Sequence, residues 1–597
     1  MNSNDPSTMN QPRPWSVVPG RVLAIGLCSL PAICAFYMIW KHWVPVPFWD
    51  EWDTPGAQLA SYYRGTLTFA ELCSQHNEHR LLFPRLVWLP MAIVFGWDVR
   101  HGMVLTFCVV CLSSAGLYQL LRSSNGTAAG RAFVFGLMNL FLFSPRQYET
   151  FLVGAQGQTF VPTFMLVLAL IVNLSRKSLR TKAIVNAVAA HVSTFSFGNG
   201  MLVWLLAFPL ETRSADLQIG RERRPILWRA VYVLAAGLSV ASYFISYRHP
   251  STTPPLVSPI AQLPGFVRFV LVWIGSLFNV DVPARCGAIV LFIFGGLAVA
   301  GIRQMRRTGT WRLHYPWLVL GCYALISGCV AAIARLGFEW SMAGDARYTA
   351  FSAFFYVAVL GLGFSVYTGI KPRALTARIA PIAAVVALVV ILALWAITFK
   401  NERRLLQFFK PAWEHSLLVM RWGAAIPQNP EIGLLTPDPL WQTVATIRTL
   451  AENDALRPRL VSQKLANAVN ERPNTDATSA GTLDGATREA TGHLSFQGWA
   501  RLPDQDRPAD CVVLGFETPD GAWKPVCVFE TGGNRPDVAR TLGSTALARA
   551  GFSGRVAASL PRGDITLKAW AIDLKKERAF PIGGAIRLPQ PPDNSRD

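Results

Sequence analysis

Charged residues are scarce in this sequence, and so are the motifs of soluble nucleotide-binding enzymes. Only 15% of the 597 residues carry charge, against 51% that are hydrophobic. Neither a GxGxxG turn nor a phosphate loop stands out, and no Ser-His-Asp framework rises above chance. Use of ATP or of a nucleotide sugar would ordinarily require a soluble cytoplasmic domain, and none is expected here. These absences argue against a soluble nucleotide-dependent enzyme.

Apolar runs of about 20 residues dominate the first two thirds of the chain, and each can cross ~30 Å of hydrocarbon as a helix. Clear runs cover residues 22–40, 104–121, 231–247, 288–302, 317–334, 350–367 and 379–399. The net charge of +20 comes from short basic clusters between such runs, as at 176–182 and 303–312, so it reports membrane topology rather than nucleic-acid binding. From a cytoplasmic N-terminus, about eleven crossings place the first loop and the C-terminus outside.

The composition changes twice along the chain. We expect a transmembrane domain over residues 1–400, with a first periplasmic loop at 41–101, and a periplasmic connector at 401–485. Residues 486–597 contain short Val-, Phe- and Trp-rich segments separated by turns, which predicts a β-sandwich. The predicted strands cover 494–500, 511–517, 523–529, 554–560 and 566–573. Residues 81–96 and 265–280 are apolar but interrupted by proline or arginine, and we expect both to lie on the external surface as amphipathic or re-entrant helices.

Two features of the predicted β-domain leave alternatives open. Cys511 and Cys527 flank a predicted turn in a compartment expected to be oxidising, so they form either a disulfide or two buried thiols. Three tryptophans could form a sugar-stacking platform or belong to the core. They are Trp499, Trp523 and Trp570.

The first candidate site is the acidic segment FWDEWDT, which follows the first apolar run by about ten residues. It supplies three carboxylates, Asp50, Glu51 and Asp53, among aromatic residues. Aromatic neighbours at the headgroup layer lower the local dielectric and tend to raise a carboxylate pKa toward useful basicity. We expect these acids to be catalytic; the alternative is that they solvate a loop.

The second candidate is HNEHR, which contains His76, Glu78, His79 and Arg80. Its His-x-x-His spacing would place both imidazoles on one helical face, where they could bind a divalent metal with a nearby acid. Because no fourth ligand is evident, hydrogen bonding to a phosphate or a sugar hydroxyl is the preferred interpretation. Simple exposure on a surface helix remains open.

Further polar residues adjoin other apolar runs. The loop at residues 144–158 carries Arg146, Tyr148, Glu149 and Gln156, and its amide side chains suit sugar hydroxyls. Arg347 and Tyr348 precede a later run, and Arg100 opens an earlier one. An arginine at such a depth can hold a lipid phosphate through paired hydrogen bonds, although Arg347 could instead pair with Asp345.

The acidic segment FWDEWDT and the residues that follow it resemble motifs of the GT-C superfamily of integral membrane glycosyltransferases. This superfamily includes protein O-mannosyltransferases and the aminoarabinose transferases that act on lipid A. Its members have an acidic pair in the first external loop, as Asp50 and Glu51 do here, followed by a surface helix ending in Phe-Gly, which residues 81–96 resemble. This sequence differs in the extra Asp53 and in Asn-Glu-His after His76.

The resemblance extends to later motifs within roughly the first 200 residues. An arginine opens the second span, matched by Arg100, and a Ser-Pro loop with an arginine and a glutamate is matched by residues 144–149. A weaker echo occurs at Arg347 and Tyr348. The resemblance implies a polyprenyl-phosphate-linked sugar donor, an inverting single displacement and Asp50 as catalytic base.

We therefore expect an all-α polytopic glycosyltransferase of the bacterial inner membrane with a C-terminal periplasmic β-sandwich. Its partners would be the lipid-linked donor, a glycan, lipid or protein acceptor, and the bilayer, but no nucleic acid. A divalent metal is the only cofactor left open. Two rival interpretations remain: a transporter or flippase of lipid-linked sugars, and a non-catalytic scaffold with a glycan-binding periplasmic domain.

Overall fold

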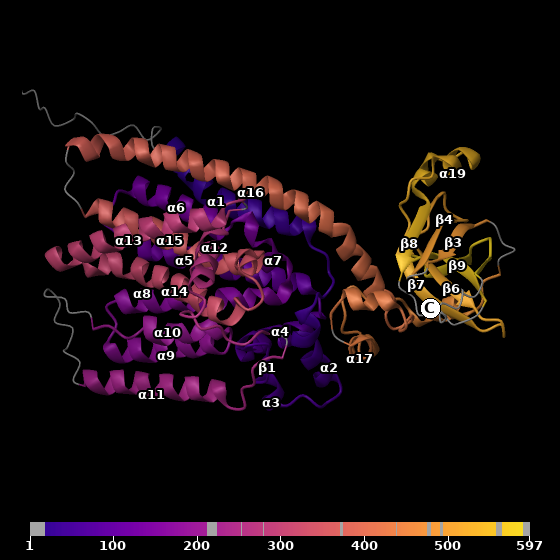
Figure 1. Ribbon diagram of the computed structural model, residues 1–597, viewed down its shortest axis with the longest axis horizontal. Helices are drawn as coiled ribbons and strands as arrows, with labels where there is room; N and C mark the ends of the chain where they lie inside the picture. The colour runs from indigo at the N-terminus through magenta and orange to yellow at the C-terminus, as the bar shows by residue number, and fades with distance from the viewer. Residues whose placement is uncertain are drawn as a thin grey trace, which may run out of the picture. The chain divides into compact units, whose positions relative to one another are not determined.

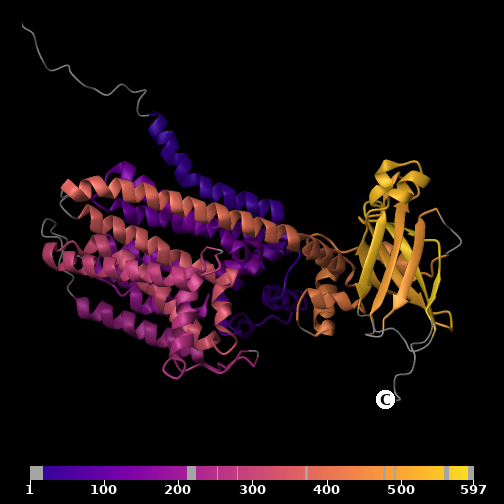
Figure 2. The same cartoon turned by 45° about the horizontal axis from the view of Figure 1, so that its top comes forward.

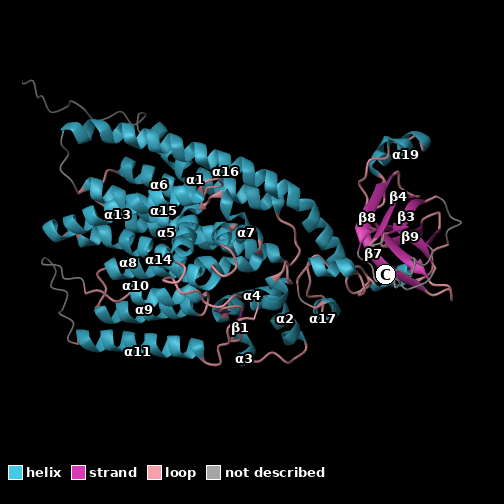
Figure 3. Cartoon of the chain, in the orientation of Figure 1, coloured by secondary structure: helices cyan, strands magenta, loops and turns pink. Residues whose placement is uncertain are grey.

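The computed structural model describes residues 18–211, 224–251, 253–278, 280–369, 374–437, 439–474, 479–489, 493–556 and 564–588. Residue contacts divide the chain into two compact units. One unit comprises Met1–Trp43, Phe69–Leu86 and Arg100–Gln407, and the other comprises Val44–Thr68, Val87–Val99 and Phe408–Asp597. We call them the helical unit and the mixed unit. Figure 3 shows that the strands, apart from one short hairpin, gather in the C-terminal part of the mixed unit.

The helical unit consists of long, apolar helices, many of which run alongside one another (Figure 1). Its longer helices are α1 (Val18–His42), α5 (Val99–Arg122), α6 (Ala128–Leu142), α8 (Val161–Leu174), α9 (Leu179–Thr194), α11 (Pro225–Phe244), α12 (Leu263–Gly275), α13 (Pro283–Thr308), α14 (Trp311–Arg335), α15 (Thr349–Thr368) and most of α16 (Ala374–Trp422). Short elements connect them: α3 (Phe69–Leu72), β1 (Gln75–His76), β2 (His79–Arg80), η3 (Pro145–Gln147), α7 (Tyr148–Leu152), η4 (Gly154–Phe160), η5 (Gly198–Met201), α10 (Leu202–Leu206), η6 (Trp340–Gly344) and η7 (Ala346–Tyr348). α4 (Leu82–Phe95) begins in this unit and continues into the mixed unit.

Eight helical stretches of the described chain are long and apolar enough to cross a membrane. They are Val99–Arg122, Ala128–Leu152, Gly154–Leu174, Pro225–Phe244, Pro283–Thr308, Trp311–Arg335, Ala346–Thr368 and Ala384–Trp422. By the length and hydropathy of these helices, the protein is a multi-pass membrane protein. The apolar segments expected at 81–96 and 265–280 contain the shorter apolar helices α4 (Leu82–Phe95) and α12 (Leu263–Gly275). The count of about eleven crossings stays a prediction.

α12 and α13 form a tight hairpin because glycine lets their backbones touch. A Cβ atom at Gly275 would lie 1.8 Å from the carbonyl oxygen of Pro283, and one at Gly287 would lie 1.9 Å from that of Leu271. Small residues permit this close approach between helices in membrane proteins. Beside the hairpin, Phe141, Leu277 and Tyr356 belong to one buried cluster, which joins α6 and α15 to the end of α12. The turn of the hairpin is thereby held against the ends of several helices.

The helices of the mixed unit come from the first loop and from the segment after residue 407. They include the end of α4, η2 (Trp52–Gly56), α2 (Ala57–Tyr63), the end of α16, η8 (Pro430–Leu434), α17 (Leu440–Glu452) and α18 (Gln463–Asn470). α2 packs against α17, and the two lie side by side in Figures 1 and 3. α17 buries Val444, Ile447 and Leu450 along one face, as expected for an amphipathic helix.

The C-terminal part of the mixed unit contains two antiparallel sheets, whose strands are clear in Figure 2. One sheet has the order β10-β9-β6-β7, with β11 also paired to β9, and the other has the order β3-β4-β5, with β8 paired to β4. The strands are β3 (Gly481–Arg488), β4 (Leu494–Leu502), β5 (Arg507–Pro508), β6 (Cys511–Glu517), β7 (Trp523–Glu530), β8 (Gly551–Val556), β9 (Ile565–Asp573), β10 (Arg578–Pro581) and β11 (Ile586–Leu588). Two short helical elements, α19 (Pro536–Thr541) and η9 (Thr545–Arg549), precede β8. Phe496 and Phe552 of one sheet share a buried core with Leu514 and Leu567 of the other.

The structure answers the two questions that the sequence left open for the β-sheet region, the state of its two cysteines and the role of its tryptophans. Cys511 and Cys527 are buried free thiols, because β6 and β7 pair Cys511 with Glu530 and Leu514 with Cys527. Of the two alternatives left open by the sequence, the disulfide is wrong and the pair of buried thiols is confirmed. The tryptophans serve packing: Trp570 is buried, the Trp523 indole donates to the carbonyl oxygen of Val469 at 2.9 Å, and Trp499 packs on the cluster around Val538.

Candidate functional site

Polar residues from distant parts of the sequence meet at one end of the helical unit. Arg146 follows α6, where the hydroxyl of Ser144 accepts a hydrogen bond from the Arg146 backbone N–H at 3.3 Å and so begins η3. Its guanidinium donates to the Oε1 atom of Glu402 at 2.9 Å and to the carbonyl oxygen of Gly344 at 2.7 Å. Glu402 is fully buried on α16. The predicted loop after α6 is thereby joined to η6 and to α16.

The two predicted clusters around Arg146 and Arg347 come together at this end. The carboxylate of Glu149 accepts a hydrogen bond from the backbone of Arg347 and lies within electrostatic range of both arginines. The Arg347 guanidinium donates to Asp345 at 3.1 Å and lies 5.3 Å from the ring centre of Tyr348. The alternative of an Asp345–Arg347 pair, left open by the sequence, is therefore confirmed.

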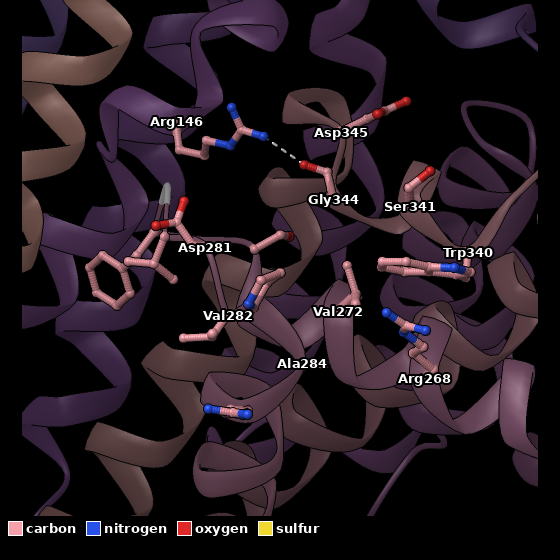
Figure 4. A pocket seen from close by; sticks show the side chains of 15 residues that line it. Arg146, Arg268, Val272, Asp281, Val282, Ala284, Trp340, Ser341, Gly344 and Asp345 are labelled. Carbon is pink, nitrogen blue, oxygen red and sulfur yellow. Dashed lines mark hydrogen bonds between the residues drawn. The ribbon is translucent and has the colours of Figure 1, made fainter.

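A cavity of ≈ 540 Å³ opens beside these residues (Figure 4). The turn of the α12–α13 hairpin, η3 and η6 contribute its walls. Three arginines line it, Arg146, Arg268 and Arg285, together with the acids Asp281 and Asp345. Figure 4 shows Arg146, Asp281 and Arg268 around the open space on three sides. The lining therefore carries an excess of positive charge, which suits an anionic group.

Arg268 and Arg285 are the cations of this cavity that remain available to a ligand. The Arg268 guanidinium lies 3.5 Å from the ring centre of Trp340, a cation–π contact that holds the side chain in place. Within the described ranges, no carboxylate forms an ion pair with Arg268 or Arg285. Both residues were missed as site residues. The sequence did contain a hint of both. Arg268 lies near Pro264 at the start of the apolar segment 265–280, and Arg285 follows Pro283 just after its end.

The HNEHR segment has a different structure from the one expected. Instead of a helix, it forms the hairpin β1–β2, in which His76 pairs with His79 and Asn77 adopts a positive φ of 48°. The tight turn needs a residue that tolerates the left-handed region, and asparagine does so better than most. The prediction of two imidazoles on one helical face is therefore wrong. The Nδ1 atom of His79 accepts a hydrogen bond from the Gly198 N–H at 3.1 Å.

The hairpin is fixed to the ends of the surrounding helices. Glu78 forms an ion pair with Arg335 of α14 at 2.7 Å. Arg80 donates to the carbonyl oxygen of Tyr243 at 2.6 Å and to that of Cys73 at 2.8 Å. Arg85, on α4, donates to the carbonyl oxygen of Ser74 at 2.8 Å, and its burial lowers the pKa of the guanidinium to about 10. These arginines stabilise the loop by satisfying its carbonyl groups.

The other predicted residues of the helical unit have identifiable neighbours. The guanidinium of Arg100 lies 5.7 Å from the ring centre of Trp43, and Gln156 is half-buried in η4. Tyr348 lies within electrostatic range of Arg335 and Glu78 as well as of Arg347. Three of the predicted clusters thus form one polar region at the end of the helical unit.

The acids of FWDEWDT belong to the mixed unit, where aromatic packing fixes their segment. The Trp52 indole donates to the carbonyl oxygen of Pro47 at 3.0 Å, and its ring meets that of Trp97 edge-on, with 5.4 Å between centres. Glu51 is buried, and its carboxylate accepts from the backbone N–H of Phe48 at 3.0 Å. Asp50 is half-buried and Asp53 is exposed. Glu51 therefore stabilises the turn, and Asp50 and Asp53 are the more accessible acids.

No protein family, curated protein or solved structure matches this chain. In the part of the chain that the structure describes, no group of three His, Cys, Asp or Glu side chains is arranged to hold a metal ion.

Proposed function

We propose that this protein is a membrane glycosyltransferase that moves a sugar from a polyprenyl-phosphate donor to a glycan, lipid or protein acceptor at the cell surface. The observation that carries the proposal is the cavity lined by Arg146, Arg268 and Arg285 at one end of apolar helices. A lipid phosphate is the anion that best fits such a place, because its tail follows the helices while guanidinium groups hold the phosphate.

The leaving phosphate explains why the arginines matter for the reaction. As the bond from the sugar to the phosphate oxygen breaks, negative charge develops on the phosphate, and fixed guanidinium groups stabilise that charge in the transition state. Arg268 and Arg285 have this role in our proposal. Arg146 and Arg347 instead position the walls, since each already pairs with a carboxylate, Glu402 and Asp345.

Asp50 is the proposed general base that removes the proton from the acceptor hydroxyl. It is half-buried, in a segment held rigid by Trp52, whereas the carboxylate of Glu51 is occupied by a backbone hydrogen bond. Asp53 would orient the acceptor. The proposed topology has about eleven crossings of the bacterial inner membrane, with the cavity and the C-terminal β-sandwich in the periplasm.

Among the rival functions, a transporter of lipid-linked sugars would need ionisable groups along a path through the membrane. The charged residues described above for the helical unit lie instead at one end of its helices, which favours the enzyme. No observation specifically favours a scaffold.

Asp50→Asn tests the proposed function, with Asp520→Asn as a matched acid-to-amide control in an exposed turn of the same unit. Surface glycans of cells expressing each variant would be analysed by mass spectrometry at equal protein levels. We expect Asp50→Asn to abolish one sugar addition and Asp520→Asn to leave it unchanged. A normal glycan in the Asp50→Asn strain would overturn the assignment of Asp50 and, with it, the proposed reaction.

A further inference from the structure

A second cavity, of ≈ 340 Å³, lies within the mixed unit between η2, α2 and α17. We call it the α2–α17 groove; its polar and aromatic lining includes Asp53, Arg64, Trp441, Gln442 and Thr446. The volume lies in the range of small-ligand sites. Nothing in the sequence pointed to α17, which belonged to a segment expected only to connect two domains.

Trp441 is the distinctive residue of this groove. The buried face of α17 is formed by Val444, Ile447 and Leu450, whereas Trp441 is 69% exposed and lies at the groove. Its exposure leaves much of a large aromatic surface in water, which costs free energy unless a ligand covers it. The flat, apolar face of a pyranose ring fits such a surface, since its axial C–H groups meet the electron-rich face of the indole.

The polar groups that line the groove together with the indole suit sugar hydroxyls rather than an anion. Asp53 can accept hydrogen bonds and Arg64 can donate them, and their formal charges cancel. Gln442 and Thr446 add an amide and a hydroxyl on the same side of α17. By contrast, the cavity beside Arg146 has an excess of arginine. The two cavities therefore differ in the chemistry that they would bind.

We infer that the α2–α17 groove binds a neutral saccharide ring of the acceptor, with Trp441 as the stacking surface and Arg64 as a hydroxyl ligand. The role as acceptor site rests on the proposed function, because Asp53 lies in the same short segment as the proposed base, Asp50. Saccharide binding itself is independent of catalysis. The acceptor class is thus a glycan, rather than a bare lipid or an unmodified protein.

Saturation-transfer difference NMR on the full chain in lipid nanodiscs tests this inference. The probes are the methyl glycosides of glucose, galactose, mannose and N-acetylglucosamine, with inorganic phosphate as the charged competitor. We expect at least one glycoside to bind, and Trp441→Ala to weaken its binding roughly tenfold. Arg64→Ala should weaken it several-fold, and phosphate should not compete.

Two matched variants control for these substitutions. Phe408→Ala removes another exposed aromatic ring of the mixed unit, which is 77% exposed and outside the groove. Arg448→Ala removes an exposed arginine of α17 that does not line the groove. Both should bind the glycoside as the wild type does. Absence of binding to every glycoside, or equal binding by Trp441→Ala, would overturn the inference. So would stronger quenching by brominated phosphatidylglycerol in the wild type than in Trp441→Phe, because Trp441 would then be seated in lipid.

Asp50→Asn separates this inference from the proposed function. If the saccharide binds at the groove but Asp50→Asn cells make a normal glycan, the inference of saccharide binding is supported and the transferase proposal is refuted. If Asp50→Asn abolishes the sugar addition while no glycoside binds, the transferase proposal is supported and the inference of saccharide binding at the groove is refuted.

Discussion

Glu78 and Arg335 lie 2.7 Å apart although 257 residues separate them in the chain. Glu78 sits in the turn between β1 and β2, and Arg335 ends α14. Both side chains are mostly shielded from water, with 17% and 22% of their surfaces exposed. The ion pair therefore fixes the position of a first-loop segment beside the polar end of the helical unit.

Breaking this ion pair should destabilise the protein. We expect Glu78→Gln and Arg335→Gln each to lower the free energy of unfolding by about 1–2 kcal/mol, because each leaves a partly shielded charge without its partner. The double variant should cost less than the sum of the two. Thermal unfolding in detergent measures these changes, and Arg176→Gln, an exposed cation of the same unit, provides the control. Strictly additive effects would show that the pair contributes nothing.

The unpaired arginines of the cavity should bind an isoprenoid phosphate. Arg268→Gln and Arg285→Gln should each weaken the binding of farnesyl phosphate roughly tenfold, the value of one charge-assisted hydrogen bond. Microscale thermophoresis with the purified chain measures this affinity. Arg403→Gln removes an exposed cation of α16 outside the cavity and should have no effect. Unchanged affinity in both cavity variants would remove the basis for phosphate binding there.

The β-sheet region should lose stability in acid through Asp573. Burial opposes ionisation of this carboxylate and by itself would raise its pKa. The carboxylate accepts hydrogen bonds from the backbone N–H groups of Lys575 and Lys576 and from the Gln505 side chain, and the charge of Arg507 lies nearby. Together these groups hold its pKa below its usual value. The pKa of Asp573 is lower in the folded protein than in the unfolded protein, where it is about 3.9. The stabilisation is therefore complete at a pH above about 3.9 and is lost as the pH falls through the pKa of the folded protein.

Hydrogen–deuterium exchange of peptides from β9, corrected for the intrinsic effect of pH on exchange, measures this loss of stability. Exchange should accelerate as the pH falls below about 4. Asp573→Asn should exchange faster at neutral pH and show a weaker response to acid. An identical pH response in wild type and variant would contradict the assignment.

Cys511 and Cys527 should remain unreactive thiols in the folded protein. Burial raises the pKa of both, so little thiolate is present at neutral pH. We expect iodoacetamide to modify them only after denaturation, without prior reduction, as measured by peptide mass spectrometry. Cys73, which is partly exposed, serves as the internal comparison. A linked peptide pair under non-reducing conditions would contradict the free thiols.

Local sequence patterns predicted much of the architecture. The strands expected at 511–517, 523–529 and 566–573 match β6 (Cys511–Glu517), β7 (Trp523–Glu530) and β9 (Ile565–Asp573) almost residue for residue. Short, alternating or wholly apolar segments between turn residues carry this information locally. Helix ends were harder to predict. The run at 379–399 continues as α16 to Trp422, and it does so across Pro411, although most of the other residues beyond the run, such as Glu402, Arg403 and Leu405, are good helix formers.

The candidate site depends on contacts that no local pattern contains. The sequence by itself determined that ionisable residues adjoin apolar helices, because hydropathy and charge are properties of each segment. Only the tertiary structure decided that Arg146 pairs with Glu402, that HNEHR turns as a hairpin, and that Trp441 and Asp53 line one groove. The physical reason is that ion pairs, cavities and ring contacts depend on distances between residues far apart in the chain, and packing of the whole fold sets those distances.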